Sequence, residues 1–380
     1  MREAINQLSV NFPEAYWREH DEKAEFPQEY FDALAKGGWF QLNVPARSGG
    51  TGLALTDVSV VIHEASRSMG MSAGDLIMAI CVFGIQTIKT FASASIKDRI
   101  LRELGSGEHI VSFCLTEPGA GVNSTDIVTS GTREGDGFVL NGHKIWSTLL
   151  HKSSLVILAT RTTPKENVTK KTNGITLFLI EKGKLKRGEI RTKRIDDISM
   201  RCLGSNEAFF EDVYVPFENV LGKVDEGWNV LSTLLNAERI STASMSVGLG
   251  ELVLGKAVNY ARTRHVFERP IGTNQGIQFP LADSKVELET CWAITKKAAW
   301  QFDHSVDSAV SANVAAYLGA KAAFLASDRA IQTYGGMAFA KSSDIERHWR
   351  DSRLFRVGPV PQEMALSFLG QHALGLPRSF

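Results

Sequence analysis

One carboxylate, Glu238, has the spacing expected of a catalytic base. Leu231, Leu234 and Leu235 precede it by seven, four and three positions, so on a helix the carboxylate shares a face with three leucines. Burial on such a face raises the pKa of a carboxylic acid and makes it a better base near neutral pH. A partly exposed Glu238 paired with an arginine would fit the same pattern. Spacing alone therefore makes Glu238 a candidate and leaves both interpretations open.

Two segments combine turn-forming residues with groups that could contact a flat ligand. Residues 116–121 read Thr-Glu-Pro-Gly-Ala-Gly after an expected strand, so a tight turn would expose backbone N–H groups and the Thr116 hydroxyl. Trp146, Ser147 and Thr148 place an aromatic plane beside two hydroxyls, which could stack on and hydrogen-bond a flavin ring. A strand-ending turn and a half-buried core tryptophan would explain the same residues.

Two later segments could hold a pyrophosphate or a dinucleotide. Arg262 and Arg264 lie at an expected helix end before Arg-Pro-Ile-Gly at 269–272, and such cations suit a pyrophosphate. Cations at this position also commonly complement the helix dipole alone. Residues 332–336 end another helix with two glycines, which would either admit a dinucleotide or form a plain C-cap.

Composition excludes several classes of protein. The chain has 380 residues, 42 basic and 42 acidic side chains and no net charge, which argues against broad attraction to nucleic acid or an anionic membrane. The longest apolar run, residues 76–85, is about half of a membrane-spanning length, and no cationic segment leads into an apolar N-terminal core, so we expect no signal peptide. Four scattered cysteines predict no disulfide framework, no metal site and a cytoplasmic location.

Three parts follow one another along the chain. Residues 1–110 carry helical patterns, residues 111–219 carry short β-branched runs between turn signals, and residues 220–380 are helical again. Residues 75–91 are apolar on nearly every face, which predicts an interior helix. No strand–helix alternation and no Gly-x-Gly-x-x-Gly after a strand occur, so we exclude a doubly wound nucleotide-binding sheet.

The middle part is predicted to be an antiparallel barrel or sandwich. Glu-Gly-Asp-Gly at 134–137 and Asn-Gly at 141–142 are both typical of β-hairpins. The third part is long enough for a helical bundle. The expected strands are residues 110–115, 138–140, 155–160, 175–180 and 209–215, and the expected long helices lie near 226–264, 281–303 and 307–334.

In chain order, these segments resemble the acyl-CoA dehydrogenases over nearly the whole chain. The resemblance implies an α+β multidomain fold with an N-terminal helical domain, a middle antiparallel β-barrel or sandwich and a C-terminal four-helix bundle. It also implies a homotetramer or homodimer with one non-covalently bound FAD per subunit. The segments that carry the resemblance are residues 116–121, 141–148, 210–216, 264–267, 332–336 and 350–353.

The resemblance assigns two groups of residues to FAD, the second group coming partly from a neighbouring subunit. The positions that match the lining of the isoalloxazine ring are Phe113, Leu115, Thr116, Trp146, Ser147 and Thr148. The positions that match the adenosine diphosphate site are Arg264, Phe267, Gln275, Gln332 and Gly336.

The implied reaction is α,β-dehydrogenation of an acyl-CoA to the trans-2-enoyl-CoA. A carboxylate removes the α proton, flavin N5 accepts the β hydride, and an electron-transfer flavoprotein takes the electrons. Many members carry the base in Tyr-Glu-Gly-Thr after Arg-Asp, where this chain has Pro359; Glu363 is nearby but off register. Members that resemble isovaleryl-CoA and long-chain dehydrogenases carry it in a helical Glu-Arg pair, which Glu238 and Arg239 match. The resemblance thus selects Glu238 as base, with Arg239 and Asn236 near the substrate.

Two departures from the family pattern bear on function. Pro359 has no N–H to polarise the thioester carbonyl, so a neighbouring amide must replace it or the carbonyl must sit differently. Val122 stands where a serine is common. We therefore keep two alternatives: a flavin-dependent monooxygenase or oxidase, and a non-catalytic acyl-CoA-binding descendant. The retained Trp-Ser-Thr at 146–148 and Arg264 favour an enzyme.

Overall fold

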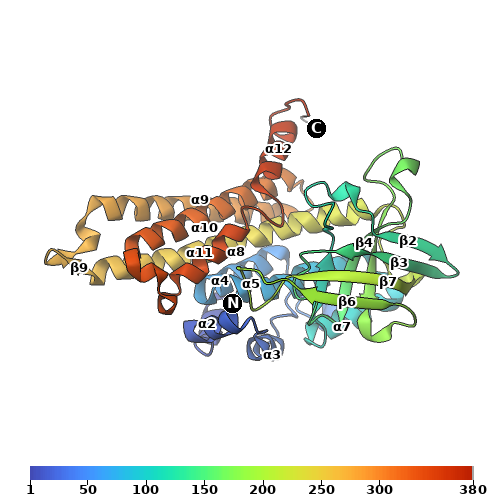
Figure 1. Ribbon diagram of the computed structural model, residues 1–380, viewed down its shortest axis with the longest axis horizontal. Helices are drawn as coiled ribbons and strands as arrows, with labels where there is room; N and C mark the ends of the chain where they lie inside the picture. The colour runs from blue at the N-terminus through green and yellow to red at the C-terminus, as the bar shows by residue number, and fades with distance from the viewer. Residues whose placement is uncertain (379–380) are drawn as a thin grey trace.

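The computed structural model describes residues 1–378 and has the helical–β–helical order that the sequence predicts. An eight-stranded sheet lies at one end of the molecule, and three long helices run from it toward the opposite end (Figure 1). The N-terminal helices lie where the long helices approach the sheet. The predicted domain limits at 110/111 and 219/220 stay predictions.

The N-terminal helices enclose an interior helical segment. All eight residues of α5 are buried, and the chain continues through the π-helical segment η2 into α6. Residues 75–91 therefore form the interior helix that their apolar composition predicts. The elements of this region are α1 (Arg2–Ser9), α2 (Glu14–Lys23), α3 (Gln28–Lys36), α4 (Leu55–Met69), α5 (Met71–Met78), η2 (Ala79–Gln86), α6 (Thr87–Phe91) and α7 (Ala94–Gly105).

The sheet has the order β6-β7-β3-β2-β4-β5-β8, with β1 added beside β4. Its neighbours are antiparallel except that β1 and β2 run parallel to β4. Both faces are covered, because Leu155 and Ile157 of β4 pack into the main core while Val156 and Leu158 pack into a second core. The strands are β1 (Val111–Cys114), β2 (Ser130–Glu134), β3 (Gly137–Lys144), β4 (Leu155–Arg161), β5 (Ile175–Glu181), β6 (Glu189–Arg194), β7 (Asn206–Pro216) and β8 (Val220–Leu221).

One of the two predicted hairpin turns is wrong. Residues 135–136 do connect β2 to β3, but Asn141 and Gly142 lie inside β3, where it pairs with β7 and its register shifts between Leu140 and Gly142. A Cβ at Gly142 would lie 2.3 Å from the Thr129 hydroxyl oxygen, so the glycine permits a close approach at an irregularity in the strand.

The long helices pack through small residues. A Cβ on Gly250 of α8 would lie 2.4 Å from Leu288 of α9, and one on Gly319 of α10 would lie 3.2 Å from the Ala243 Cα of α8. With α11 against α10 and α8, they form the expected helical bundle. Its helices are α8 (Gly227–Thr263), α9 (Gln275–Asp303), α10 (Ala309–Tyr334), α11 (Ile345–Leu354) and α12 (Gln362–His372), and the short strands β9 (His265–Val266) and β10 (Arg269–Pro270) separate α8 from α9.

Two helical stretches, Met71–Phe91 and Ala309–Phe339, are long and apolar enough to cross a membrane by length and composition alone. The first is almost entirely buried in the protein interior, and the second is about half buried. Core helices of this kind satisfy the same criterion, so the two stretches are weak grounds for membrane insertion.

Candidate active site

Glu238 lies in the interior, in the N-terminal third of α8. Glu238 is 4% exposed, and its Oε2 atom has no hydrogen-bond partner among residues 1–378. Burial raises the pKa of Glu238 to about 8, while Arg239 lowers it and Asp75 raises it further. Leu231 and Leu234 are buried on the same helix. The helical spacing thus identified a buried carboxyl, and within the described residues it forms no ion pair.

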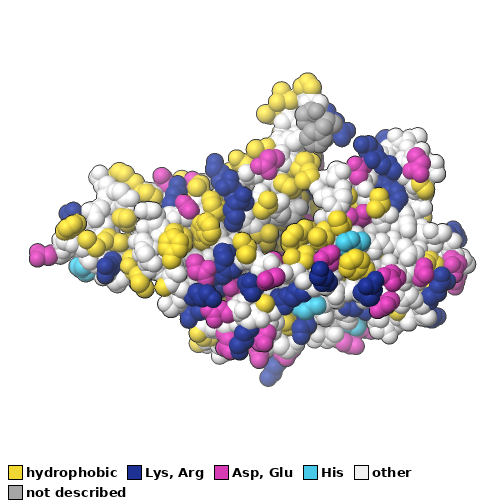
Figure 2. All heavy atoms as spheres, in the orientation of Figure 1, with side chains coloured by type: hydrophobic (Ala, Val, Ile, Leu, Met, Phe, Trp, Pro, Cys, Tyr) yellow, Lys and Arg dark blue, Asp and Glu magenta, His cyan; other side chains and the backbone are white. Residues whose placement is uncertain are grey.

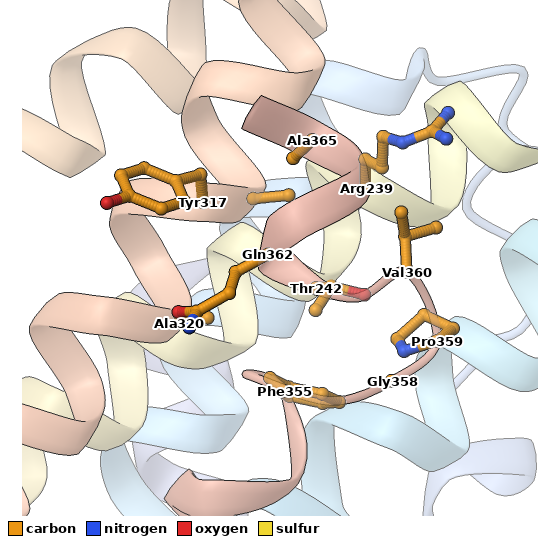
Figure 3. Close-up of a pocket in the computed structure, with 11 residues that line it drawn as sticks. Arg239, Thr242, Tyr317, Ala320, Phe355, Gly358, Pro359, Val360, Gln362 and Ala365 are labelled. Carbon is orange, nitrogen blue, oxygen red and sulfur yellow. The ribbon is translucent and has the colours of Figure 1, made fainter. Parts of the chain in front are cut away.

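The loop after α11 reaches the same part of α8. Pro359 and Val360 line a small cavity together with Arg239 and Thr242, one turn beyond Glu238 (Figure 3). The two positions at which the family resemblance places a base are thereby brought near each other, although 120 residues separate them in sequence. Glu363, by contrast, is exposed and bonded to Gln362, so it does not face this cavity.

The residues that flank Glu238 are placed by local contacts. The Arg239 guanidinium donates from Nη1 to the Asn236 Oδ1 at 3.1 Å, while its buried Nε has no partner within residues 1–378. Burial lowers the pKa of Arg239, and the adjacent Glu238 opposes that shift. Arg239 and Asn236 therefore sit together beside the candidate base, as the substrate assignment requires, and that assignment stays a prediction.

The two segments assigned to the flavin ring lie side by side. The Ile145 N–H donates to the Thr116 carbonyl at 2.9 Å, and the Ser112 hydroxyl donates to the Thr148 carbonyl at 2.7 Å. Trp146 is 55% exposed and has a positive φ of 62°, which a non-glycine residue seldom adopts. Its ring is thus a surface plane and not the half-buried core residue of the alternative interpretation.

The other residues assigned to the isoalloxazine ring differ in how far they are buried. Phe113, Leu115, Thr116 and Thr148 are partly exposed, whereas Ser147 is 1% exposed. The Ser147 backbone exchanges two hydrogen bonds of 3.0 Å with Asn206, and Asn206 Nδ2 donates a further bond to the Ser147 carbonyl. Ser147 therefore ties its segment to the start of β7 through hydrogen bonds with Asn206. Its predicted contact with the flavin stays a prediction.

A buried ion pair that we did not single out in the sequence joins these two segments. Lys144, which is fully buried, donates from Nζ to Glu117 Oε1 at 2.8 Å and to the Leu115 carbonyl at 2.9 Å. Glu117 also accepts the backbone N–H groups of Val128 and Thr129. Against the effect of burial, Lys144 lowers the pKa of Glu117. The signal in the sequence was a charged residue inside each predicted motif.

The residues assigned to the adenosine diphosphate lie at the opposite end of the bundle. Arg264 caps α8, 26 positions beyond Glu238, which is about 39 Å along a helix. Phe267 is 94% exposed in the turn between β9 and β10, and that turn is far from the sheet in Figure 1. Gln275, Gln332 and Gly336 are exposed. One chain therefore does not bring the two predicted halves of the FAD site together.

An unpaired interior acid on a long helix and, on a separate pair of segments, an exposed tryptophan plane are features that an enzyme could use to remove a proton and to hold a flat cofactor. Models of three acyl-CoA dehydrogenase domains match this chain: the N-terminal domain over residues 1–108, the middle domain over 112–213 and the C-terminal domain over 225–374. The chain belongs to the acyl-CoA dehydrogenase family, a family of FAD-binding oxidoreductases. The predicted family, fold class, enzyme class and cofactor are confirmed.

Individual relatives match along the whole chain. Acyl-CoA dehydrogenase FadE12 of Mycobacterium tuberculosis is 31% identical and covers 100% of this chain and 96% of its own. The 3-(aryl)acrylate reductase of Clostridium sporogenes is 29% identical over 93% of both chains. Among solved structures, butyryl-CoA dehydrogenase from Megasphaera elsdenii superposes with a TM-score of 0.91 at 26% identity and covers 98% of each chain. These relatives differ in their named substrates, so similarity alone does not select one.

Proposed function

We propose that this protein dehydrogenates an acyl-CoA thioester to the trans-2-enoyl-CoA, with Glu238 as the base that removes the α proton. The observation that carries the proposal is the buried Glu238 carboxyl, whose Oε2 has no partner among residues 1–378 and whose pKa burial raises to about 8. A carboxylate in this state binds a proton well near neutral pH. Bound FAD supplies the hydride acceptor, flavin N5.

Val360 is the proposed donor that replaces the N–H missing at Pro359. Val360 lines the cavity beside Arg239 and Thr242. The backbone N–H of Val360 has no hydrogen-bond partner among the described residues. An N–H fixed toward the thioester carbonyl stabilises the negative charge that develops there when the α proton leaves. The family role of a backbone amide would thus move by one residue along the loop.

The FAD site is proposed to be completed by a second copy of the chain, in a homotetramer or homodimer. Arg264, in the adenosine diphosphate half of the predicted site, lies about 39 Å along α8 from Glu238, and this separation supports such an assembly. So do large apolar side chains exposed on the bundle, among them Phe279, Val286 and Trp300 of α9. Figure 2 shows hydrophobic side chains gathered over the long helices, whereas charged side chains gather over the N-terminal helices and the sheet. Such a patch on a monomer indicates a contact surface.

The electron acceptor and the location are proposed from the family and from the cysteines. An electron-transfer flavoprotein is the expected acceptor. All four cysteines are buried free thiols, which supports the predicted cytoplasmic location. No sign of a nucleic-acid partner is expected from a chain without net charge.

The test is an anaerobic screen of the purified holoenzyme against short, branched, long and aromatic acyl-CoA thioesters, followed by flavin absorbance. We expect at least one thioester to bleach the flavin and the corresponding enoyl-CoA to form, with electrons passing to an electron-transfer flavoprotein. Reduced enzyme that reacts rapidly with oxygen and ignores the flavoprotein would favour the oxidase alternative. Bleaching by no thioester at all would refute the proposal.

A further inference from the structure

A second buried carboxyl, Asp75, lies in the interior helical segment that packs on α8. It is 5% exposed on α5, four residues before the π-helical segment η2, and π-helical turns frequently occur at functional sites. The side chain forms no hydrogen bond and no ion pair with any of residues 1–378, and burial raises its pKa to about 7. A buried carboxyl without a partner costs folding free energy, so the stability of the fold does not explain it.

The packing of α5 on α8 places this carboxyl near the candidate base. A Cβ on Gly74 would lie 3.0 Å from Met245 Cγ of α8, and Met245 is seven positions, about two helical turns, after Glu238 on the same face. Farther along, the Gly222 N–H donates to the Phe91 carbonyl, so the interior segment runs antiparallel to α8 and passes Glu238 just beyond Asp75. The charge of Asp75 accordingly raises the pKa of Glu238.

Unpartnered polar atoms extend along this face of α8. Glu238 Oε2, Ser241 Oγ and Thr242 Oγ1 are buried without a hydrogen-bond partner within the described chain, although nine in ten buried polar groups are normally bonded. Among residues 1–378, Arg239, the next residue, is the one cation that acts on Glu238. An apolar acyl chain would leave the two hydroxyls unpaired, whereas a polar acyl group could form hydrogen bonds in this region.

We propose that Asp75 is a specificity residue and that the acyl group of the natural substrate carries a hydrogen-bond donor, a hydroxyl or an amine, which the Asp75 carboxyl accepts. The inference rests on the proposed function, because it places the acyl chain between α5 and the base on α8. It restricts the substrate class, since a plain alkyl chain would bury Asp75 without a partner. Sites built to bond a polar group discriminate strongly against analogues that lack it.

The test compares CoA thioesters of four to eight acyl carbons that end in a hydroxyl, an ammonium or a methyl group at the same heavy-atom count. kcat/KM is measured on the holoenzyme with an artificial electron acceptor. At one chain length we expect a donor-bearing thioester to exceed its methyl analogue at least about tenfold. A hydroxyl preference would indicate a neutral hydrogen bond, and an ammonium preference would indicate an ion pair with Asp75. A methyl analogue that is equal or better at every length would overturn the proposal.

Variants locate the preference at Asp75. Asp75→Leu should reduce the ratio of donor-bearing to methyl substrate to one or below, and Asp75→Asn, which keeps the volume, should reduce it less. Ser66→Ala is the matched control, because its buried hydroxyl packs against Gly74 from α4, and it should leave the ratio unchanged. A ratio unaffected by Asp75→Leu would also overturn the proposal. If Asp75→Leu does not fold, the proposal is tested by the substrate ratio of the wild type and by the change in that ratio in Asp75→Asn.

The role of Glu238 as base and the role of Asp75 in specificity can be refuted separately. Dissociation constants of the same thioesters, measured by calorimetry on Glu238→Gln holoenzyme, should show the donor preference without turnover. Normal turnover by Glu238→Gln would refute Glu238 as base and leave the preference measurable. Lost activity in Glu238→Gln, combined with no donor preference, would refute the role of Asp75 alone.

Discussion

Glu117 and Glu238 are both glutamates at 4% exposure, yet their surroundings are opposite. Glu117 accepts hydrogen bonds from Lys144 and from two backbone N–H groups, and Lys144 lowers its pKa against the effect of burial. Glu238 has an Oε2 with no partner among residues 1–378, and burial raises its pKa. The comparison separates a carboxylate that holds two segments together from one that is free to take up a proton.

Removing the unpaired acid should affect catalysis most. Glu238→Gln keeps the shape of the side chain and removes the base, so we expect kcat to fall by about 10²–10⁴-fold while flavin content and melting temperature stay near wild type. Turnover with the best thioester measures the effect. Glu363→Gln, which changes an exposed glutamate of the C-terminal segment, is the control and should be neutral. Equal losses in both variants would contradict the assignment.

Removing the partner of the paired acid should instead affect stability. Lys144→Met leaves Glu117 buried without its cation, which typically costs about 3–5 kcal/mol, and it frees the segments that carry Thr116 and Trp146. We expect a lower melting temperature and loss of bound flavin, measured by calorimetry and by absorbance. The double variant with Glu117→Gln should recover part of the stability. A stable, flavin-replete Lys144→Met would show that the pair does not position the site.

A substitution at Val360, in the loop after α11, should have a smaller and more local effect on catalysis. Val360→Pro removes the N–H that we propose as the carbonyl donor, and loss of one such donor costs about 10²–10³-fold in kcat. Val360→Ala retains the N–H and should keep nearly full activity. Stopped-flow bleaching rates distinguish the two variants, and equal rates would exclude this amide.

The most gradual expected effect is the change of protein stability with pH. Because the folded pKa of Glu238 is raised from 4.5 to about 8, the folded state binds more protons in this window. The contribution of Glu238 is therefore fully present below about pH 4.5 and is lost as pH rises through 8. Each pH unit in the window changes stability by at most about 1.4 kcal/mol. The melting temperature of Glu238→Gln relative to wild type should rise from pH 5 to pH 9, and a constant difference would contradict the raised pKa.

The same contrast explains what the sequence could and could not predict. Helical spacing identified the buried face of α8, because burial depends on a local period of 3.6 residues. The Glu117–Lys144 ion pair and the influence of Asp75 on Glu238 join segments that are distant in sequence, and no local pattern specifies such relations. Asn141 and Gly142 read as a hairpin because the same dipeptide suits a tight turn and an irregular strand; the close approach of Thr129 decides between them.

The sequence motifs indicated which segments lie side by side, but not the distances between the more remote ones. The segments around Thr116 and Trp146 meet as expected, through the Ile145–Thr116 hydrogen bond. The Arg264 segment is recognisable in sequence, but only the 37-residue length of α8 shows how far it lies from Glu238. Such a separation depends on tertiary structure, and it supports the proposal that a second subunit completes the site.

The most direct test of the account is the pH dependence of anaerobic flavin bleaching at subsaturating thioester, measured on wild type and Glu238→Gln. A base must be deprotonated to act, so the wild-type rate should fall about tenfold per pH unit below about pH 8 and level off above it. Glu238→Gln should bleach slowly, and its rate should not fall in this way below pH 8. A wild-type bleaching rate that does not change between pH 6 and pH 9 would contradict Glu238 as the catalytic base. So would a Glu238→Gln variant that bleaches at the full rate with the same pH dependence as wild type.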